Sequence, residues 1–198
     1  PQPFLSYIHF MPPHSPYSPS KEYVGMFDDG FKPTAKPRHP TAEKGSNQQT
    51  LNKQRQAYDE HLAYVDAQFA RLYQSLELQG VLKNTCLVFT SDHGEMFERG
   101  ELGHATPLLY EPVIHVPLLL SAPGQSQRVD VHDLTSTVDI LPTLLAIGGQ
   151  QSEIRSPLDG QVLPGLGFAA PEGIGPDDLL DHPRNVRAGE EAGLVPIC

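Results

Sequence analysis

An aspartate and a histidine stand side by side at the end of an apolar run of strand length. The run is CLVFT (86–90), and Asp92 and His93 follow it within SDHGE. Side chains at the carboxyl end of a buried parallel strand point into the crevice where open α/β sheets bind ligands. Asp92 offers an oxygen and His93 a nitrogen to a divalent cation. The alternative for an isolated pair of this kind is that Asp92 caps a helix and His93 is incidental.

Two further histidines stand in loops that suit the same chemistry. His14 lies in PPHSPY, where flanking prolines restrict the backbone and would hold an imidazole in place. A fixed histidine can donate a hydrogen bond to an anionic oxygen or protonate a leaving group. Taken alone, His14 also fits a surface turn. His104 comes after a glycine, downstream of the Asp–His pair, and it is either a third ligand or a contact for an anion.

The elements expected around these residues are those of an α/β domain. From Gln54 to Gly80 apolar residues recur at spacings of four and three, which predicts a helix that Gly80 ends. CLVFT and VPLLLSA (116–122) are continuous apolar runs, typical of strands buried on both faces of a parallel sheet. The other predicted elements are a strand over PFLSYIHF (3–10) and a helix over residues 133–149.

Two stretches lack such periodicity. Residues 18–50 are polar and contain prolines, which predicts a surface loop over the site or at its edge. Residues 151–198 are rich in proline and glycine, which predicts an irregular tail. We therefore expect one domain over residues 1–150, followed by this tail. Pro142 suits the first turn of a helix, so the last predicted helix should start late or kink there.

Composition and charge argue against several partners. The formal net charge of −10 disfavours nucleic acid and anionic membrane surfaces. No stretch approaches the roughly 20 continuous apolar residues of a membrane span. The start, PQPFLSYIHF, has no basic region or cleavage site, so we do not expect a signal peptide. It opens almost at once with a strand-like pattern and without methionine, from which we expect a piece of a longer protein. Cys86 and Cys198 have no partners at metal-ligand spacing, and the oligomeric state is not predicted.

The order of these motifs resembles the sulfatases of the alkaline-phosphatase-like superfamily over about residues 3–165. FLSYIHFMPPHSPY is similar to that family's strand and PHxPY loop. YDEHLAYVDAQFARLYQSLELQGVLKNTCLVFTSDHGE is similar to its helix, strand and metal-binding loop, and LYEPVIHVPLLLSAPG and STVDILPTLLAIGG resemble the family's next two segments. The resemblance implies an α/β, partial alkaline-phosphatase-like fold with a mainly parallel sheet flanked by helices. It matches the C-terminal part of the catalytic domain.

The resemblance also assigns roles to the four site residues. It implies that Asp92 and His93 bind a divalent ion, with calcium expected first and manganese, magnesium or zinc also compatible. It implies that His14 contacts the sulfate or the leaving oxygen of an ester substrate. Many sulfatases have a lysine after the metal pair, whereas here His104 occupies the GH region, as in phosphoryl-transfer relatives. We expect His14 and His104 to be the catalytic histidines.

The nucleophile of the family is not found in these segments. Sulfatases use a cysteine or serine in a C/S-x-P/A-x-R motif, with the cysteine converted to formylglycine, and neither Cys86 nor Cys198 fits it. We expect formylglycine in a missing N-terminal part and no activity from this chain alone. Three functions stay open: a sulfuric-ester hydrolase, a phosphodiesterase or phosphoethanolamine-transferase-like relative, and a non-catalytic pseudoenzyme. The family's usual locations imply an extracytoplasmic protein, whether periplasmic, secreted or lysosomal.

Overall fold

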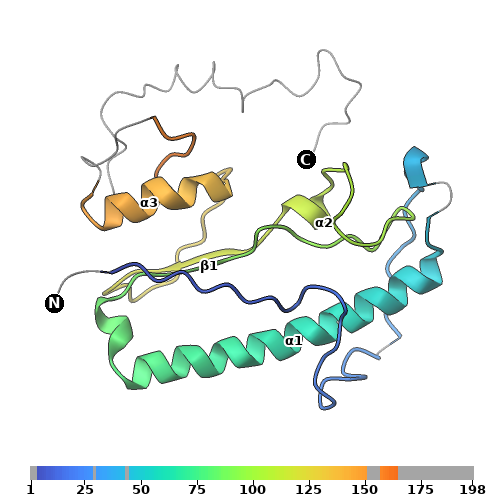
Figure 1. Cartoon of the computed structure of the whole chain (residues 1–198), viewed down its shortest axis with the longest axis horizontal. Coiled ribbons are helices and arrows are strands. Elements are labelled where there is room, and N and C mark those ends of the chain that lie inside the picture. Colours follow the sequence, from blue (N-terminus) through green and yellow to red (C-terminus); the bar gives the residue numbers. More distant parts are fainter. Residues whose placement is uncertain (1–3, 29, 43–44, 151–156, 165–198) are drawn as a thin grey trace. The chain divides into compact units, whose positions relative to one another are not determined.

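The computed structural model describes residues 4–28, 30–42, 45–150 and 157–164 (Figure 1). The chain divides into two compact units, residues 1–126 and 127–198, and each is described by itself. All four predicted site residues lie in the first unit. Most of the predicted tail, residues 151–198, lies outside the described residues. The expected domain boundary at residue 150 stays a prediction.

The first unit is built on one long helix, α1 (Gln48–Leu78). Asn47 caps its start, because the Asn47 side-chain oxygen accepts a hydrogen bond from the backbone N–H of Thr50 at 2.9 Å. After its end, Gly80 adopts a left-handed φ of 71°, which glycine does without steric cost. The predicted helix and its stop are confirmed. However, α1 begins at Gln48, before the predicted residue 54, because its first turns are mostly polar and the spacing of apolar residues could not reveal them. No helix in the described part of the chain is long and apolar enough to cross a membrane.

A small sheet pairs β1 (Leu87–Thr90) with β2 (Leu118–Ser121). The sequence predicts both strands correctly, but the mainly parallel sheet is wrong for the described residues, because these two strands are antiparallel. A parallel pair needs a crossover connection, whereas here a loop and a short helix return the chain alongside β1 in the opposite direction. Both strands are also only partly covered, rather than buried on both faces.

The predicted strand at residues 3–10 is not formed over its described part, residues 4–10. Within the described residues, no backbone hydrogen bond joins this segment to another one, and a strand requires such pairing. Its apolar side chains are exposed on both alternating faces, with exposed fractions of 85% for Phe4, 78% for Leu5 and 84% for Tyr7. The segment has the composition of a central strand and lacks the pairing of one.

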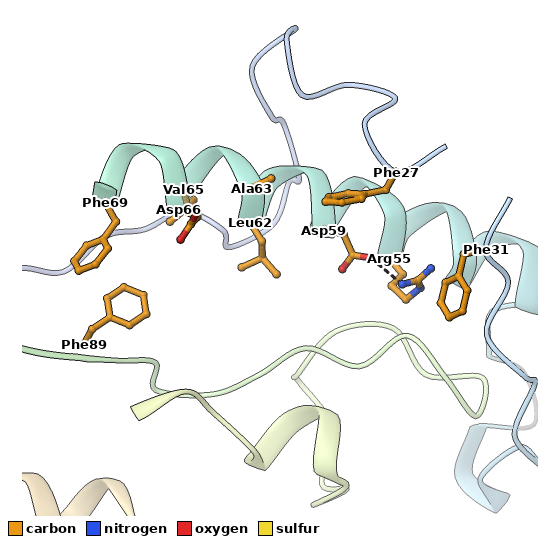
Figure 2. A pocket seen from close by; sticks show the side chains of 10 residues that line it. All are labelled: Phe27, Phe31, Arg55, Asp59, Leu62, Ala63, Val65, Asp66, Phe69 and Phe89. Atoms are coloured by element: carbon orange, nitrogen blue, oxygen red, sulfur yellow. Dashed lines mark hydrogen bonds and ion pairs between the residues drawn. The ribbon is translucent and has the colours of Figure 1, made fainter. Parts of the chain in front are cut away.

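The apolar stripe of α1 lines an open groove of about 570 Å³ (Figure 2). Phe69 of α1 and Phe89 of β1 face each other across it, with ring centroids 4.7 Å apart. Arg55 forms an ion pair with Asp59 at 2.8 Å and lies over the ring of Phe31, with 5.0 Å between its guanidinium carbon and the ring centroid. None of the predicted site residues lines this groove. The groove and the candidate site are therefore separate features of the first unit.

The segment between β1 and β2 carries three of the four site residues and is fixed by backbone contacts. The Gly94 N–H donates a hydrogen bond to the Val113 carbonyl at 2.7 Å, in the short helix α2 (Glu111–Ile114). A Cβ atom at Gly94 would run into the backbone of α2, so this close approach requires glycine. Met96, which is fully buried, pairs with Gly103 through two backbone hydrogen bonds of 3.3 and 2.9 Å.

The polar 18–50 stretch contacts the residues that lie between Met96 and Gly103. Lys36 forms an ion pair with Glu98 at 2.8 Å. The Ser46 N–H donates a hydrogen bond to the Gly100 carbonyl at 2.8 Å. The described part of the stretch thereby borders the segment that leads from the Asp–His pair to the third histidine. The short 3-10 elements of the first unit are η1 (Pro40–Ala42) and η2 (Val81–Asn84).

The described part of the second unit contains η3 (Thr137–Asp139) followed by α3 (Ile140–Ile147). Ser136 and Asp139 form a capping box, in which each side chain accepts a hydrogen bond from the other residue's backbone N–H. Pro142 lies in the first turn of α3, where its missing N–H has no helical partner to lose. This confirms the late start predicted for the helix within residues 133–149.

Candidate active site

Three histidines from three separate segments meet in the first unit. The rings of His93 and His104 stack, with centroids 3.8 Å apart and planes inclined by 25°. The ring of His14 meets that of His104 edge-on, with 5.6 Å between centroids. Asp92 completes the group, because its Oδ1 lies 3.8 Å from the Nε2 of His93. The structure therefore brings all four predicted site residues together, while their roles remain predictions.

Each of the three imidazoles uses its Nδ1 on a neighbouring oxygen. Nδ1 lies 2.7 Å from the carbonyl oxygen of the next residue in His14 and 2.9 Å from that of the next residue in His93. A carbonyl oxygen only accepts, so Nδ1 carries the proton in both rings. Nδ1 of His104 lies 3.1 Å from Oε1 of Glu95. All three rings therefore present Nε2 for a metal ion, a proton or an anionic oxygen.

The Asp92 carboxylate is readily accessible, with 73% of its side chain exposed. Its Oδ1 accepts a hydrogen bond from the backbone N–H of His93 at 3.0 Å. Partial burial raises the pKa of Asp92, but the charge of His93, two backbone hydrogen bonds and the charge of His9 together lower it. Because this pKa falls below its ordinary value, the group is ionised at neutral pH, as a cation ligand must be.

Asp92 and His93 fit one side of a divalent-cation site. The 3.8 Å between Oδ1 and Nε2 allows both atoms to reach one ion at about 2.0–2.6 Å. The Nδ1–H of His93 donates to a backbone carbonyl, which is the usual way that a metal-ligating histidine is oriented. In the described part of the chain no group of three or more His, Cys, Asp or Glu residues could hold an ion. An oxygen-ligated calcium takes about six to eight donors, so further donors would be needed.

Sequence reasoning missed two residues of this site, Tyr17 and Glu95. Oε2 of Glu95 accepts a hydrogen bond from the Tyr17 hydroxyl at 2.8 Å, while Oε1 faces His104. The Glu95 side chain is only 5% exposed. Burial, and then the hydrogen bond to Glu95, raise the pKa of Tyr17 well above its ordinary value, which keeps its hydroxyl a donor. Their places at the ends of PHSPY and SDHGE were the available signal.

The family model described as "Sulfatase" matches residues 1–149 of the chain. The chain therefore belongs to the sulfatase family, as its motifs predict.

Two curated relatives illustrate how much of the family's length is present. The chain is 28% identical over 173 residues to the "Putative extracellular sulfatase Sulf-1 homolog" of Caenorhabditis elegans, a match that covers 78% of the chain and 24% of that protein. It is 30% identical over 172 residues to N-acetylglucosamine-6-sulfatase of Bos taurus, a match that covers 80% of the chain and 30% of the relative. The matched region therefore spans about a quarter to a third of the length of these relatives.

Two solved structures are also similar to the chain, and each match again covers about a third of the solved protein. The phosphonate monoester hydrolase SpPMH from Silicibacter pomeroyi superposes with a TM-score of 0.66 at 27% identity, covering 76% of the chain and 34% of that protein. A protein from a locus for the metabolism of multiple glycosaminoglycans in Bacteroides thetaiotaomicron superposes with a TM-score of 0.62 at 27% identity, covering 80% and 32% respectively. The fold is therefore similar to part of the alkaline-phosphatase-like sulfatase and phosphonate hydrolase structures.

Proposed function

We propose that this chain supplies the metal-binding and anion-contacting side of the active site in a metal-dependent sulfatase, which hydrolyses sulfuric esters. One observation carries the proposal: His14, His93 and His104 converge beside Asp92, and each ring presents Nε2. Ester hydrolysis at an anionic centre needs a cation and fixed donors around the charged oxygens. Membership of the sulfatase family favours the sulfate group as that anion.

Asp92 and His93 are the proposed ligands of the ion. A bound divalent cation would supply positive charge to the non-bridging oxygens of the ester. Calcium is expected first from the family resemblance, and manganese, magnesium and zinc also suit a site with one carboxylate and one imidazole. The other donors are proposed to come from the rest of the protein and from water.

His14 and His104 are the proposed contacts for the substrate. The Nδ1–H of His14 is held by a backbone carbonyl, which fixes the ring and directs Nε2 away from that bond. In its protonated form this Nε2 would donate to the sulfate or give its proton to the leaving oxygen. His104 lies between His14 and the metal pair, so its Nε2 would serve the non-bridging oxygens.

The nucleophile is proposed to be a formylglycine supplied by another part of the complete protein. Neither Cys86 nor Cys198 lies in a C-x-P/A-x-R motif. Burial raises the pKa of the Cys86 thiol, and a protonated, partly buried thiol is a poor nucleophile. We therefore expect the 198-residue chain by itself to hydrolyse no aryl sulfate, and robust turnover by the pure chain would contradict this.

A second candidate is the hydrolysis or transfer of phosphorus esters, as in phosphodiesterases and phosphoethanolamine transferases. It is favoured by the similarity to a phosphonate monoester hydrolase. It is also favoured by His104, which stands where many sulfatases have a lysine. A third candidate is a non-catalytic protein that keeps the fold and part of the metal site.

The distinguishing experiment compares 4-nitrophenyl sulfate with bis(4-nitrophenyl) phosphate as substrates of the complete protein. We expect the sulfate ester to be hydrolysed faster, with activity lost on chelation and restored by calcium. Faster turnover of the phosphate diester would favour the second candidate. Turnover of neither ester by protein that is loaded with metal would favour the third.

An extracytoplasmic location is the remaining part of the proposal. One relative bears the name "Putative extracellular sulfatase Sulf-1 homolog", and the family resemblance implies export or delivery to lysosomes. Cell fractionation of the native source should find the protein outside the cytoplasm. Recovery in the cytoplasmic fraction alone would contradict the proposed location.

A further inference from the structure

Glu95 is the one described side chain that links the PHSPY loop, the SDHGE loop and the GH loop by hydrogen bonds. Its Oε2 accepts from the hydroxyl of Tyr17 at 2.8 Å, and its Oε1 lies 3.1 Å from the Nδ1 of His104. Tyr17 is 78 residues from Glu95 in the sequence. Only 5% of the Glu95 side chain is exposed, so water has little access to its carboxylate and could not readily replace the hydrogen bond to Tyr17 or to His104.

The chemistry of the partners fixes the direction of both hydrogen bonds. Tyr17 remains a phenol, since burial and the neighbouring carboxylate raise its pKa. A carboxylate oxygen accepts, so the second bond places a proton on Nδ1 of His104. His104 therefore has Nε2 on the side away from Glu95. His14 and His93 obtain the same tautomer from the backbone carbonyl of the next residue, whereas His104 depends on a side chain.

Both ends of this bridge are held in place by packing. The ring of Tyr17 contacts the rings of Tyr58 and Phe97 edge-on, with centroids 5.3 and 5.8 Å apart. Glu95 and His104 directly adjoin Met96 and Gly103, which are paired by two backbone hydrogen bonds. The carboxylate and the imidazole therefore start from fixed backbone positions, and the hydrogen bond sets only the orientation and tautomer of the ring.

We propose that Glu95 is a positioning residue, which holds His104 in the Nδ1–H tautomer with Nε2 directed to the substrate, and that Tyr17 braces Glu95. This inference rests on the proposed function, in which His104 contacts the anionic ester. Glu95 itself touches neither the ion nor the ester in this scheme. Replacing a group that orients a metal-ligating histidine typically changes affinity or activity by about 10–100-fold, and we expect the same range for the orientation of His104.

The test is Glu95→Gln in the complete protein, followed by ¹⁵N NMR of the histidine rings and by steady-state kinetics. The amide of glutamine has one acceptor oxygen, which can serve only one of the two donors, the Tyr17 hydroxyl or the Nδ1–H of His104. Its NH₂ group then faces the remaining donor and cannot accept from it. We expect His104 to lose its single Nδ1–H tautomer and kcat for 4-nitrophenyl sulfate to fall about 10–100-fold. Calcium affinity should not change, because the Asp92 and His93 donors are untouched. An unchanged tautomer together with an unchanged kcat would overturn the proposal.

Glu98→Gln is the matched control. It is the same substitution in the same segment, and the Glu98 side chain is also mostly covered, at 20% exposed. Glu98 pairs with Lys36 at 2.8 Å and with Arg99 at 3.3 Å instead of with a site histidine, so we expect neither the tautomer nor kcat to change. If kcat fell equally in this control, the effect at Glu95 would be a general one on the loop and the proposal would fail.

Tyr17→Phe tests the brace and remains available if Glu95→Gln does not fold. It removes one hydroxyl and keeps the aromatic packing, so His104 should keep its tautomer while kcat falls less than in Glu95→Gln. A wild-type kcat in Tyr17→Phe would overturn the bracing role. The tautomer is measured without substrate, so a failure of the positioning proposal can be distinguished from a failure of the proposed sulfatase function. A tautomer that depends on Glu95 in a protein without esterase activity would support the positioning and overturn the function.

Discussion

Asp92→Ala should remove metal binding while leaving the metal-free fold almost unchanged. The Asp92 side chain is 73% exposed, and its hydrogen bonds are to the adjoining residues His93 and Ser91. Replacing an exposed side chain of this kind normally changes the free energy of unfolding by no more than about 0.5 kcal/mol. We therefore expect the metal-free variant and the metal-free wild type to unfold at nearly the same urea concentration.

The loss in metal affinity should be much larger. Residues that only orient a metal ligand cost about 10–100-fold in affinity or activity when replaced. Asp92 is proposed to supply both an oxygen and a negative charge directly, as one of two described donors. We therefore expect the calcium affinity to fall by more than about 100-fold, which is about 2.8 kcal/mol of binding free energy. The stabilisation of the fold by added calcium should disappear with it.

Calorimetric titration with calcium and thermal unfolding with and without calcium measure both quantities on the complete protein. Asp130→Ala is the control, because it removes the same charge from an exposed aspartate that pairs with Arg128. Wild-type calcium affinity in Asp92→Ala would refute the ligand assignment. A strongly destabilised metal-free variant would show instead that Asp92 supports the fold.

Three further predictions concern single residues. Gly94→Ala should lower the free energy of unfolding by about 1–3 kcal/mol in urea titrations, because the methyl group would run into the backbone of α2. Burial lowers the pKa of His61 in the folded protein, so the unfolded chain takes up a proton at this histidine more readily than the folded one. The stability that the buried neutral imidazole contributes is therefore present above the ordinary pKa near 6.5 and is lost as the pH falls below that value. His61→Gln should therefore flatten the fall in unfolding free energy between about pH 7 and 5. Asp139→Ala should cost about 1–3 kcal/mol and speed hydrogen exchange at the Gln161 amide, because Asp139 Oδ1 accepts from that N–H at 2.9 Å; unchanged exchange there would contradict this.

Elements set by local sequence were predictable, including the positions of β1 and β2, but which segments pair and in which direction was not. The spacing of apolar residues predicted α1, Gly80 its end, and Pro142 the late start of α3, since each depends on residues within a few turns. The sheet depends on which segments become neighbours. Residues 4–10 have a strand's composition, but no described segment pairs with their backbone, so composition alone misled.

The same distinction applies to the candidate site. Asp92 and His93 could be named as candidates because they share one short motif, and His14 and His104 because their loops have recognisable neighbours; the structure brings the four together, while their roles stay predictions. Tyr17 and Glu95 were missed because neither has a role that is visible locally. Their hydrogen bond joins positions 78 residues apart, and a buried carboxylate acquires its function only from the donors that the fold brings to it.

The candidate site combines an orienting hydrogen bond on each of its three imidazoles with a partial set of proposed metal donors. Each of the three imidazoles already has its Nδ1 hydrogen-bonded within the first unit, so the direction of every Nε2 is set without an ion. Asp92 and His93, the proposed ligands, would in contrast provide only two of the roughly six to eight donors that calcium takes. Because orientation precedes binding, replacing Asp92 should cost affinity without moving the histidines, whereas replacing Glu95 should disturb His104 without costing affinity. Lost calcium affinity with an unchanged His104 tautomer in the Asp92 variant, and the reverse in the Glu95 variant, would therefore distinguish the proposed metal-binding residues from the residue that positions the anion contact.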